Sequence, residues 1–112
     1  MNSVVIVGRA GQDSDIKYFE SGKVRTNFSL AVNRWDSKTK SEVADWFNVD
    51  VWDKLAEFAG EYVKKGIQVV VDGRIAQNKW TDKATGNDRE NFYILANNIR
   101  LLGSKRDIEQ IW

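Results

Sequence analysis

The chain has 112 residues, 42% of them hydrophobic, which suits one small domain with a single core and leaves no room for a second. It contains neither cysteine nor histidine, so disulfides, thiol chemistry, imidazole catalysis and a usual zinc site are excluded. The 17 Lys and Arg residues against 16 Asp and Glu give a formal net charge of +1, so any attraction for a polyanion must be local. We expect neither an enzyme nor a bound metal or cofactor.

The sequence gives no sign of a membrane segment. No window approaches the roughly 18 consecutive apolar residues that a membrane span needs. Met1 leads into the apolar run Val4 to Val7 without the basic region that is typical of a signal or transit peptide. We therefore expect the protein to have no membrane partner and to stay in the cytoplasm, where it is made.

The N-terminal third of the chain has the pattern of strands joined by turns. Val4 to Gly8 is a short apolar strand, and Ile16 to Glu20 alternates in polarity before the turn residues Ser21-Gly22. A longer alternating strand follows from Val24 to Trp35, so the first three strands are expected to form a meander. The polar stretch from Asp36 to Val43 predicts a long loop.

In the middle of the chain the spacing of apolar residues changes from two to between three and four. This change predicts one short helix, with Asp53 capping its start and Gly66 ending it. A strand from Ile67 to about Trp80, a polar loop from Thr81 to Asp88 and an apolar segment from Phe92 to Leu102 follow.

This order of elements predicts an all-β fold. Five strands with one short helix between the third and fourth are the order of the OB-fold, a Greek-key barrel. The strands are long for a minimal barrel, so we expect hairpin arms to project from it. The barrel should occupy residues 1–103, and residues 104–112 should form a short C-terminal extension.

Four of the five tryptophans fall on the polar side of a strand pattern. In the strand that ends at Trp35 the even positions are apolar, so Trp35 joins the polar row. Trp46 and Trp52 share a row with an amide and a carboxylate, Asn48 and Asp50, while the odd positions between them are apolar. All three indoles are therefore expected to face away from the core.

Trp80 lies on the same kind of row in the strand after the helix. If no bulge interrupts this strand, its even row runs through Asp72, Arg74 and Asn78 to Trp80. The row expected to be buried is formed by Val69, Val71 and Ile75.

Tryptophans interleaved with basic and amide side chains are typical of a surface on which unpaired bases stack. Such stacking contributes ~1–3 kcal/mol per base, so four sites would outweigh a single net charge. A single exposed indole is normal, and some of the four could instead close the end of a barrel or lie in a subunit contact. Periodicity alone does not distinguish a nucleic acid from a sugar or a protein as the ligand.

Four runs of residues resemble the bacterial single-stranded DNA-binding protein family in order and spacing. They are Val4 to Asp13, Trp46 to Glu57, Tyr62 to Gly66 and Lys79 to Asp82. The resemblance covers residues 1 to about 103. It implies an OB-fold, a homotetramer, and sequence-independent wrapping of single-stranded DNA during replication, recombination and repair at the nucleoid.

The resemblance also implies roles for individual residues. The family's base-stacking positions are matched by Trp35, Trp46, Trp52 and Trp80. Its phosphate-contact positions are matched by Lys54 and Lys79, and location alone adds Arg9 after the first strand together with Arg25 and Arg34 near Trp35. Each of these cations could instead be a solvated surface charge.

The sequence departs from the family pattern in three places. Asp50 places a carboxylate on the expected binding face, and Asn48 fills a position that is often basic, so both should weaken phosphate attraction locally. The family usually carries a disordered linker with an acidic tip that recruits replication and repair proteins, where this sequence has residues 104–112. A tailless primosome-type protein that acts through protein contacts and an RNA-binding OB protein are therefore alternatives.

Overall fold

The computed structural model describes residues 1–102, so the predicted C-terminal extension at residues 104–112 lies outside the described part. The described residues form six strands and one helix: β1 (Val4–Ala10), β2 (Asp15–Tyr18), β3 (Val24–Asp36), β4 (Ser41–Trp52), α1 (Asp53–Tyr62), β5 (Gln68–Thr81) and β6 (Asp88–Leu102). No helix in the described residues is long and apolar enough to cross a membrane.

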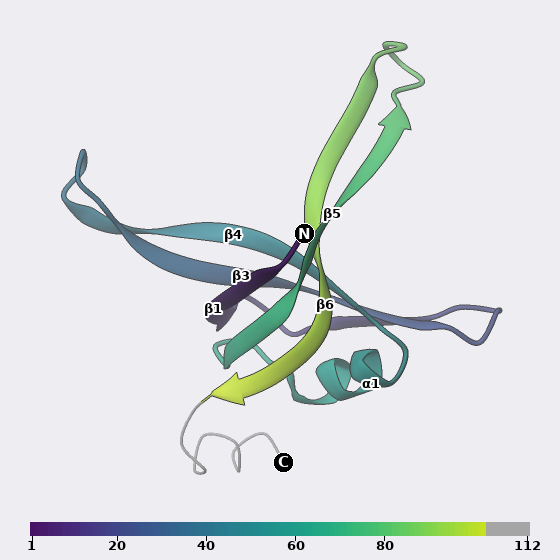
Figure 1. The fold of residues 1–112 in the computed structure, drawn as a ribbon, viewed down its shortest axis with the longest axis horizontal. Helices are drawn as coiled ribbons and strands as arrows, with labels where there is room; N and C mark the ends of the chain where they lie inside the picture. The colour runs from purple at the N-terminus through teal and green to yellow at the C-terminus, as the bar shows by residue number, and fades with distance from the viewer. Residues whose placement is uncertain (103–112) are drawn as a thin grey trace.

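Five of the strands close a barrel in the order β1-β5-β6-β4-β3, and the ring is completed where the end of β1 pairs with β3. β4 and β6 are the parallel neighbours in this ring, and the other neighbours are antiparallel. α1 follows β4, the third barrel strand, and precedes β5, the fourth (Figure 1). The predicted five-stranded OB-fold with one helix is thus confirmed.

The predicted meander of the first three strands is wrong. β2 lies outside the ring and pairs with β3, whereas β1 pairs with β5 along most of its length. The pairing of β1 with β5 joins residues that are far apart in the sequence, such as Val5 with Asp72. Alternation within a short strand carries no information about such a distant partner.

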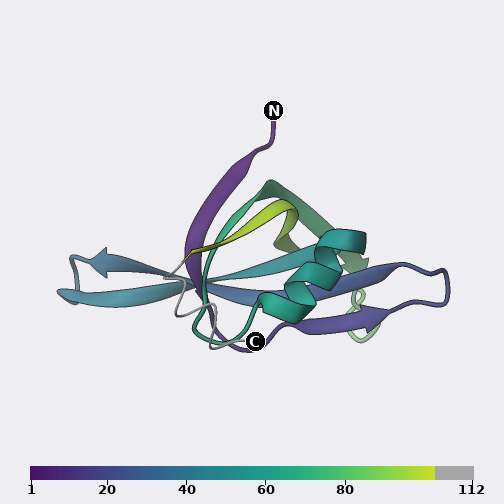
Figure 2. The same ribbon diagram turned by 90° about the horizontal axis from the view of Figure 1, so that it is seen from below.

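The core is formed by the apolar rows of the barrel strands. The largest fully buried side chains are Phe28, Leu30, Val49, Val51, Val63, Val69, Val71 and Thr26. Within the described residues Thr26 is the buried polar side chain, and its hydroxyl donates to the carbonyl of Ala56 in α1 at 2.5 Å. α1 packs against this end of the barrel through Ala56 and Ala59 (Figure 2).

The caps predicted for α1 are not those that form. Trp52 holds the N-cap position without a side-chain cap bond, and Asp53 is the first helical residue, with φ of 60°. The helix ends at Tyr62, with Val63 as the C-cap, so Gly66 lies in the turn beyond it. The backbone N–H of Val63 donates to Ala59, which satisfies one of the last carbonyls without a glycine.

A bulge interrupts the pairing of β5 with β6. Asp72 pairs with Asn98 but Gly73 pairs with Ala96, so β6 has one additional residue at this point. A Cβ on Gly73 would lie 2.1 Å from the carbonyl oxygen of Leu95, so the two backbones approach as only glycine allows. Ile75, predicted to be buried, is 48% exposed.

Long hairpin arms project from the barrel, as predicted (Figures 1 and 2). β3 and β4 stay paired out to Asp36 and Ser41, and β5 and β6 stay paired out to Thr81 and Asp88. The predicted long loop from Asp36 to Val43 is therefore half strand, and only residues 37–40 form the turn between the two strands. A hairpin can satisfy its backbone hydrogen bonds without an apolar face.

Candidate nucleic-acid interface

The outer face of the ribbon formed by β3 and β4 carries three of the four tryptophans. Residues directly opposite each other in an antiparallel ladder share a face. Trp35 lies opposite Glu42, and Trp46 and Trp52 lie opposite Ala31 and Arg25. All three belong to the row that points away from the core, and they are 64%, 61% and 36% exposed. We call this outer face of β2, β3 and β4 the tryptophan face.

The three indoles form a line along the ribbon. Ala31, which pairs with Trp46, lies four residues before Trp35 along β3. Trp52 lies six residues after Trp46 along β4. At a rise of about 3.4 Å per residue, these intervals correspond to about 14 and about 20 Å. Such a line suits an extended ligand with several flat groups better than one compact molecule.

Trp46 is supported by the loop after β1. A Cβ on Gly11 would lie 2.3 Å from Cζ3 of Trp46, so the indole rests directly against this glycine. Gly11 is held beside β3 because its backbone N–H donates to the carbonyl of Ser29 at 3.0 Å. The loop therefore fixes one side of the ring and leaves the rest of the ring to solvent.

Trp52 stacks on Phe19, a residue that the sequence analysis did not select. The ring centroids are 5.7 Å apart with an interplanar angle of 25°. Lys17 Nζ lies 5.2 Å from the Phe19 centroid and the Arg25 guanidinium lies 5.7 Å from it, so two cations flank the aromatic pair. The alternation of Lys17 with Phe19 was the signal that could have placed Phe19 on this face.

A polar network lies between Trp46 and Trp52. The amide Nδ2 of Asn27 donates to Asp50 Oδ1 at 2.6 Å and to Asn48 Oδ1 at 2.8 Å. The three residues belong to neighbouring rows of the tryptophan face. The network fixes two side chains on the surface between the indoles.

Two of the five predicted cations lie on the row of an indole, and a third follows Trp52 in sequence. Arg25 is directly opposite Trp52, and Arg9 is opposite Ala31, which is itself opposite Trp46. Arg9 Nη1 also donates to the carbonyl of Gly66 at 2.9 Å. Lys54 is exposed in the first turn of α1, two residues after Trp52.

Arg34 and Lys79 are placed differently. Arg34 lies opposite Val43, on the other face of the arm from Trp35, and its Nε forms an ion pair with Asp45 at 2.8 Å. Lys79 is exposed on β5, opposite Glu90 and next to Trp80 in sequence. Phosphate contacts by all five cations remain predictions.

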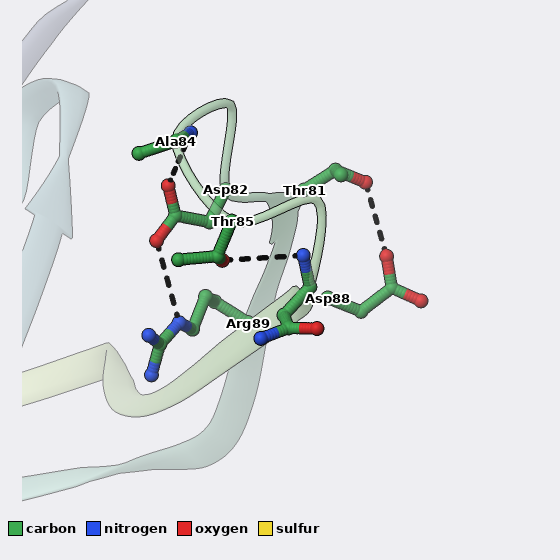
Figure 3. Close-up of polar contacts among 7 residues, drawn as sticks. Thr81, Asp82, Ala84, Thr85, Asp88 and Arg89 are labelled. Carbon is green, nitrogen blue, oxygen red and sulfur yellow. Dashed lines mark hydrogen bonds and ion pairs between the residues drawn. The ribbon is translucent and has the colours of Figure 1, made fainter.

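Trp80 lies apart from the other tryptophans, near the end of the β5–β6 arm, and is 49% exposed. Ala76, which shares its row, is apolar and buried, so the row that leads to Trp80 is not polar along its whole length. Figure 3 shows that the tip beyond it is held by polar contacts: Thr81 donates to Asp88 at 3.0 Å, and Arg89 lies 3.6 Å from Asp82.

Comparison with known proteins shows the family to which the chain belongs. The model of the single-strand binding protein family matches residues 1–102. The chain belongs to this family. Membership of a binding family confirms the expectation that the chain is not an enzyme. Among the described residues, no group of three or more acidic side chains is placed to hold a metal ion.

Individual relatives are similar over nearly the whole chain. Single-stranded DNA-binding protein 1 of Synechocystis sp. is 51% identical over 107 residues, which are 96% of this chain and 88% of that protein. Single-stranded DNA-binding protein 1 of Nostoc sp. is 47% identical over 96% of this chain and 87% of its own length. The single-stranded DNA-binding protein of Thermosynechococcus vestitus is 41% identical over 97% of this chain and 88% of its own.

Changing Gly11 to Ala tests the support of Trp46. The added methyl group would collide with the indole and displace it, because the backbone of Gly11 is held by Ser29. We expect Gly11→Ala to weaken oligo-dT binding, but by less than the ~1–3 kcal/mol of a lost stacking residue. The measurement is a fluorescence titration, with Gln12→Ala in the same exposed loop as the control. Equal affinity of Gly11→Ala and Gln12→Ala would contradict the role of this contact.

Proposed function

We propose that the chain binds single-stranded DNA without regard to sequence, and that it protects such strands during replication, recombination and repair in the cytoplasm. The observation that carries the proposal is the line of exposed indoles on one face of the β3–β4 ribbon. Membership of the single-strand binding protein family and the names of its relatives support it. Several exposed indoles on one face leave apolar surface in contact with water. A ligand that covers this face in use removes that surface from water.

In this proposal stacking supplies most of the affinity. Bases stack on Trp35, Trp46, Trp52 and Trp80, each contributing ~1–3 kcal/mol. Phe19 holds Trp52 in one orientation before DNA arrives, so less conformational entropy is lost on binding. Stacking recognises the flat face that every base has, which is why the binding is sequence-tolerant.

Cations near the indoles then hold the phosphates. The proposed contacts are made by Arg9, Arg25, Arg34, Lys54 and Lys79. Arg25 and Arg9 have the best placement, since both lie on rows of the tryptophan face. Arg34 would first have to leave its ion pair with Asp45, which is partly exposed and therefore weak.

Quenching of tryptophan fluorescence by oligo-dT tests the proposal directly. Bases stacked on the indoles should strongly reduce emission. Trp46→Ala should weaken binding by ~1–3 kcal/mol and leave the fold intact, because the side chain points away from the core. Tyr18→Ala, which removes an exposed aromatic ring from the opposite row of β2, is the matched control.

Two results would contradict the stacking proposal. The first is unchanged emission at saturating oligo-dT. The second is a Trp46→Ala protein that binds as well as the Tyr18→Ala protein.

We also propose that the protein is a homotetramer. In the described residues, the edge of β1 that does not face β5 pairs only at Arg9 and Ala10, so the segment from Val4 to Gly8 is an open edge. Val5 and Val7 on it are 64% and 44% exposed, and no proline or charge protects the segment. A strand from a second copy would satisfy this edge.

A second apolar surface supports a further contact between copies. Where the two long arms diverge, a cavity of about 290 Å³ is lined mainly by apolar side chains of β1, β4, β5 and β6, including Phe47, Ile75 and Phe92.

Light scattering should give about four times the 12.8 kDa of one chain. Val5→Lys should yield smaller species, because it places a charge on the open edge. A wild-type monomer would overturn this proposal.

A further inference from the structure

The hydrogen bonds of the polar network between Trp46 and Trp52 determine which of its polar atoms are free to contact a base. Asn27 uses its Nδ2 group to donate to one oxygen of Asp50 and to the oxygen of Asn48. Within residues 1–102 no other side chain bonds Asp50 Oδ2 or Asn48 Nδ2. The network thus presents one free acceptor, on Asp50, and one free donor, on Asn48, to whatever crosses the face.

A DNA strand that stacks on both indoles must pass over Asn48 and Asp50. Trp46 and Trp52 are separated by six residues of one strand, or about 20 Å, and Asn48 and Asp50 are the two same-face residues between them. A carboxylate accepts hydrogen bonds but donates none when it is ionised. Asp50 therefore attracts an amino group and repels a carbonyl oxygen at the edge of a base.

We propose that Asp50, oriented by Asn27, adds to the sequence-tolerant stacking a preference of about fivefold for bases with an exocyclic amino group, so that cytosine binds better than uracil or thymine. The amino group of cytosine donates to Asp50 Oδ2, and Asn48 Nδ2 donates to an acceptor on the same edge. Uracil and thymine place a carbonyl oxygen where cytosine has the amino group. The inference rests on the proposed function, because it needs a single strand on the tryptophan face.

The effect of Asp50 on phosphates is separate from its effect on bases. Its negative charge repels the backbone of every strand equally, so it lowers all affinities without favouring a base. Only a hydrogen bond to the base edge gives a ratio that differs between cytosine and uracil. The ratio of the two affinities, rather than either affinity alone, is the informative quantity.

Oligo-dC and oligo-dU of equal length are the matched probes, since their bases differ only at the edge that would face Asp50. Titrations of tryptophan fluorescence at pH 8, where cytosine is unprotonated, give both affinities. We expect the dC to dU ratio to fall about fivefold in Asp50→Asn, the lower end of the discrimination that a base-edge contact gives. The asparagine amide can turn to present either a donor or an acceptor, so it loses the preference.

Asp15→Asn is the control for charge. Asp15 lies opposite Asn27 on the same cross-strand row as Asp50, and it takes no part in the network. The Asp15→Asn substitution removes one negative charge from the same face. Both affinities should therefore rise while the dC to dU ratio stays at the wild-type value. Thermal melting of each variant verifies the fold, and Asp50→Ser provides a second test of the same loss.

The outcomes separate this inference from the proposed function. If both oligomers bind and the ratio is the same in wild type, Asp50→Asn and Asp50→Ser, base selection by Asp50 is overturned while single-strand binding stands. An equal fall of the ratio in Asp15→Asn would also overturn it, because charge alone would then be sufficient. If neither oligomer quenches the indoles of the wild-type protein, the proposed function itself fails.

Discussion

The antiparallel ladder between β3 and β4 determines where every proposed contact lies. Its register places Phe28 opposite Val49 on the inside, and a slip by one residue would turn each side chain to the other face. Burial of these apolar side chains stabilises one register, because the slipped one would expose them and bury Asn27 and Asp50. The same packing that stabilises the barrel therefore also aligns Trp35, Trp46 and Trp52.

The outer face is organised by contacts that come from elsewhere in the chain. The loop after β1 supplies Gly11 beneath Trp46, and the end of β2 supplies Phe19 beside Trp52. Both contacts hold an indole that would otherwise sample several rotamers in water. With a net charge of only +1, such ordering has more influence on affinity than the overall field of the protein.

The sequence was sufficient to predict the barrel and the exposed indoles, because both follow from local alternation. Alternation with a period of two is enough to assign Phe28 and Leu30 to the buried row of one strand. It also assigns Trp46 and Trp52 to the exposed row of the next strand. The same rule could have placed Arg34 away from Trp35, since Arg34 falls on the even, core-facing row. Its selection rested on nearness in sequence, which does not determine the face of a strand.

The features that the sequence did not predict depend on tertiary contacts. The bulge beside Gly73 arises from an additional residue on β6, a strand about 20 residues away. The pairing of β1 with β5 and the position of Phe19 against Trp52 join segments that no short window contains. The roles of the tryptophans and cations in DNA binding remain predictions that only a bound strand can test.

The most direct test of the central claim is a titration of the ¹⁵N-labelled protein with a short dT oligomer, followed through the indole N–H resonances. We predict that the resonances of Trp35, Trp46 and Trp52 shift together, because one strand lies along the face that they share. The backbone amides of Ala56 and Ala59, which are buried behind the core in α1, should not move. Shifts centred on α1 or on the open edge of β1, with the three indole resonances unmoved, would contradict the assignment of this face.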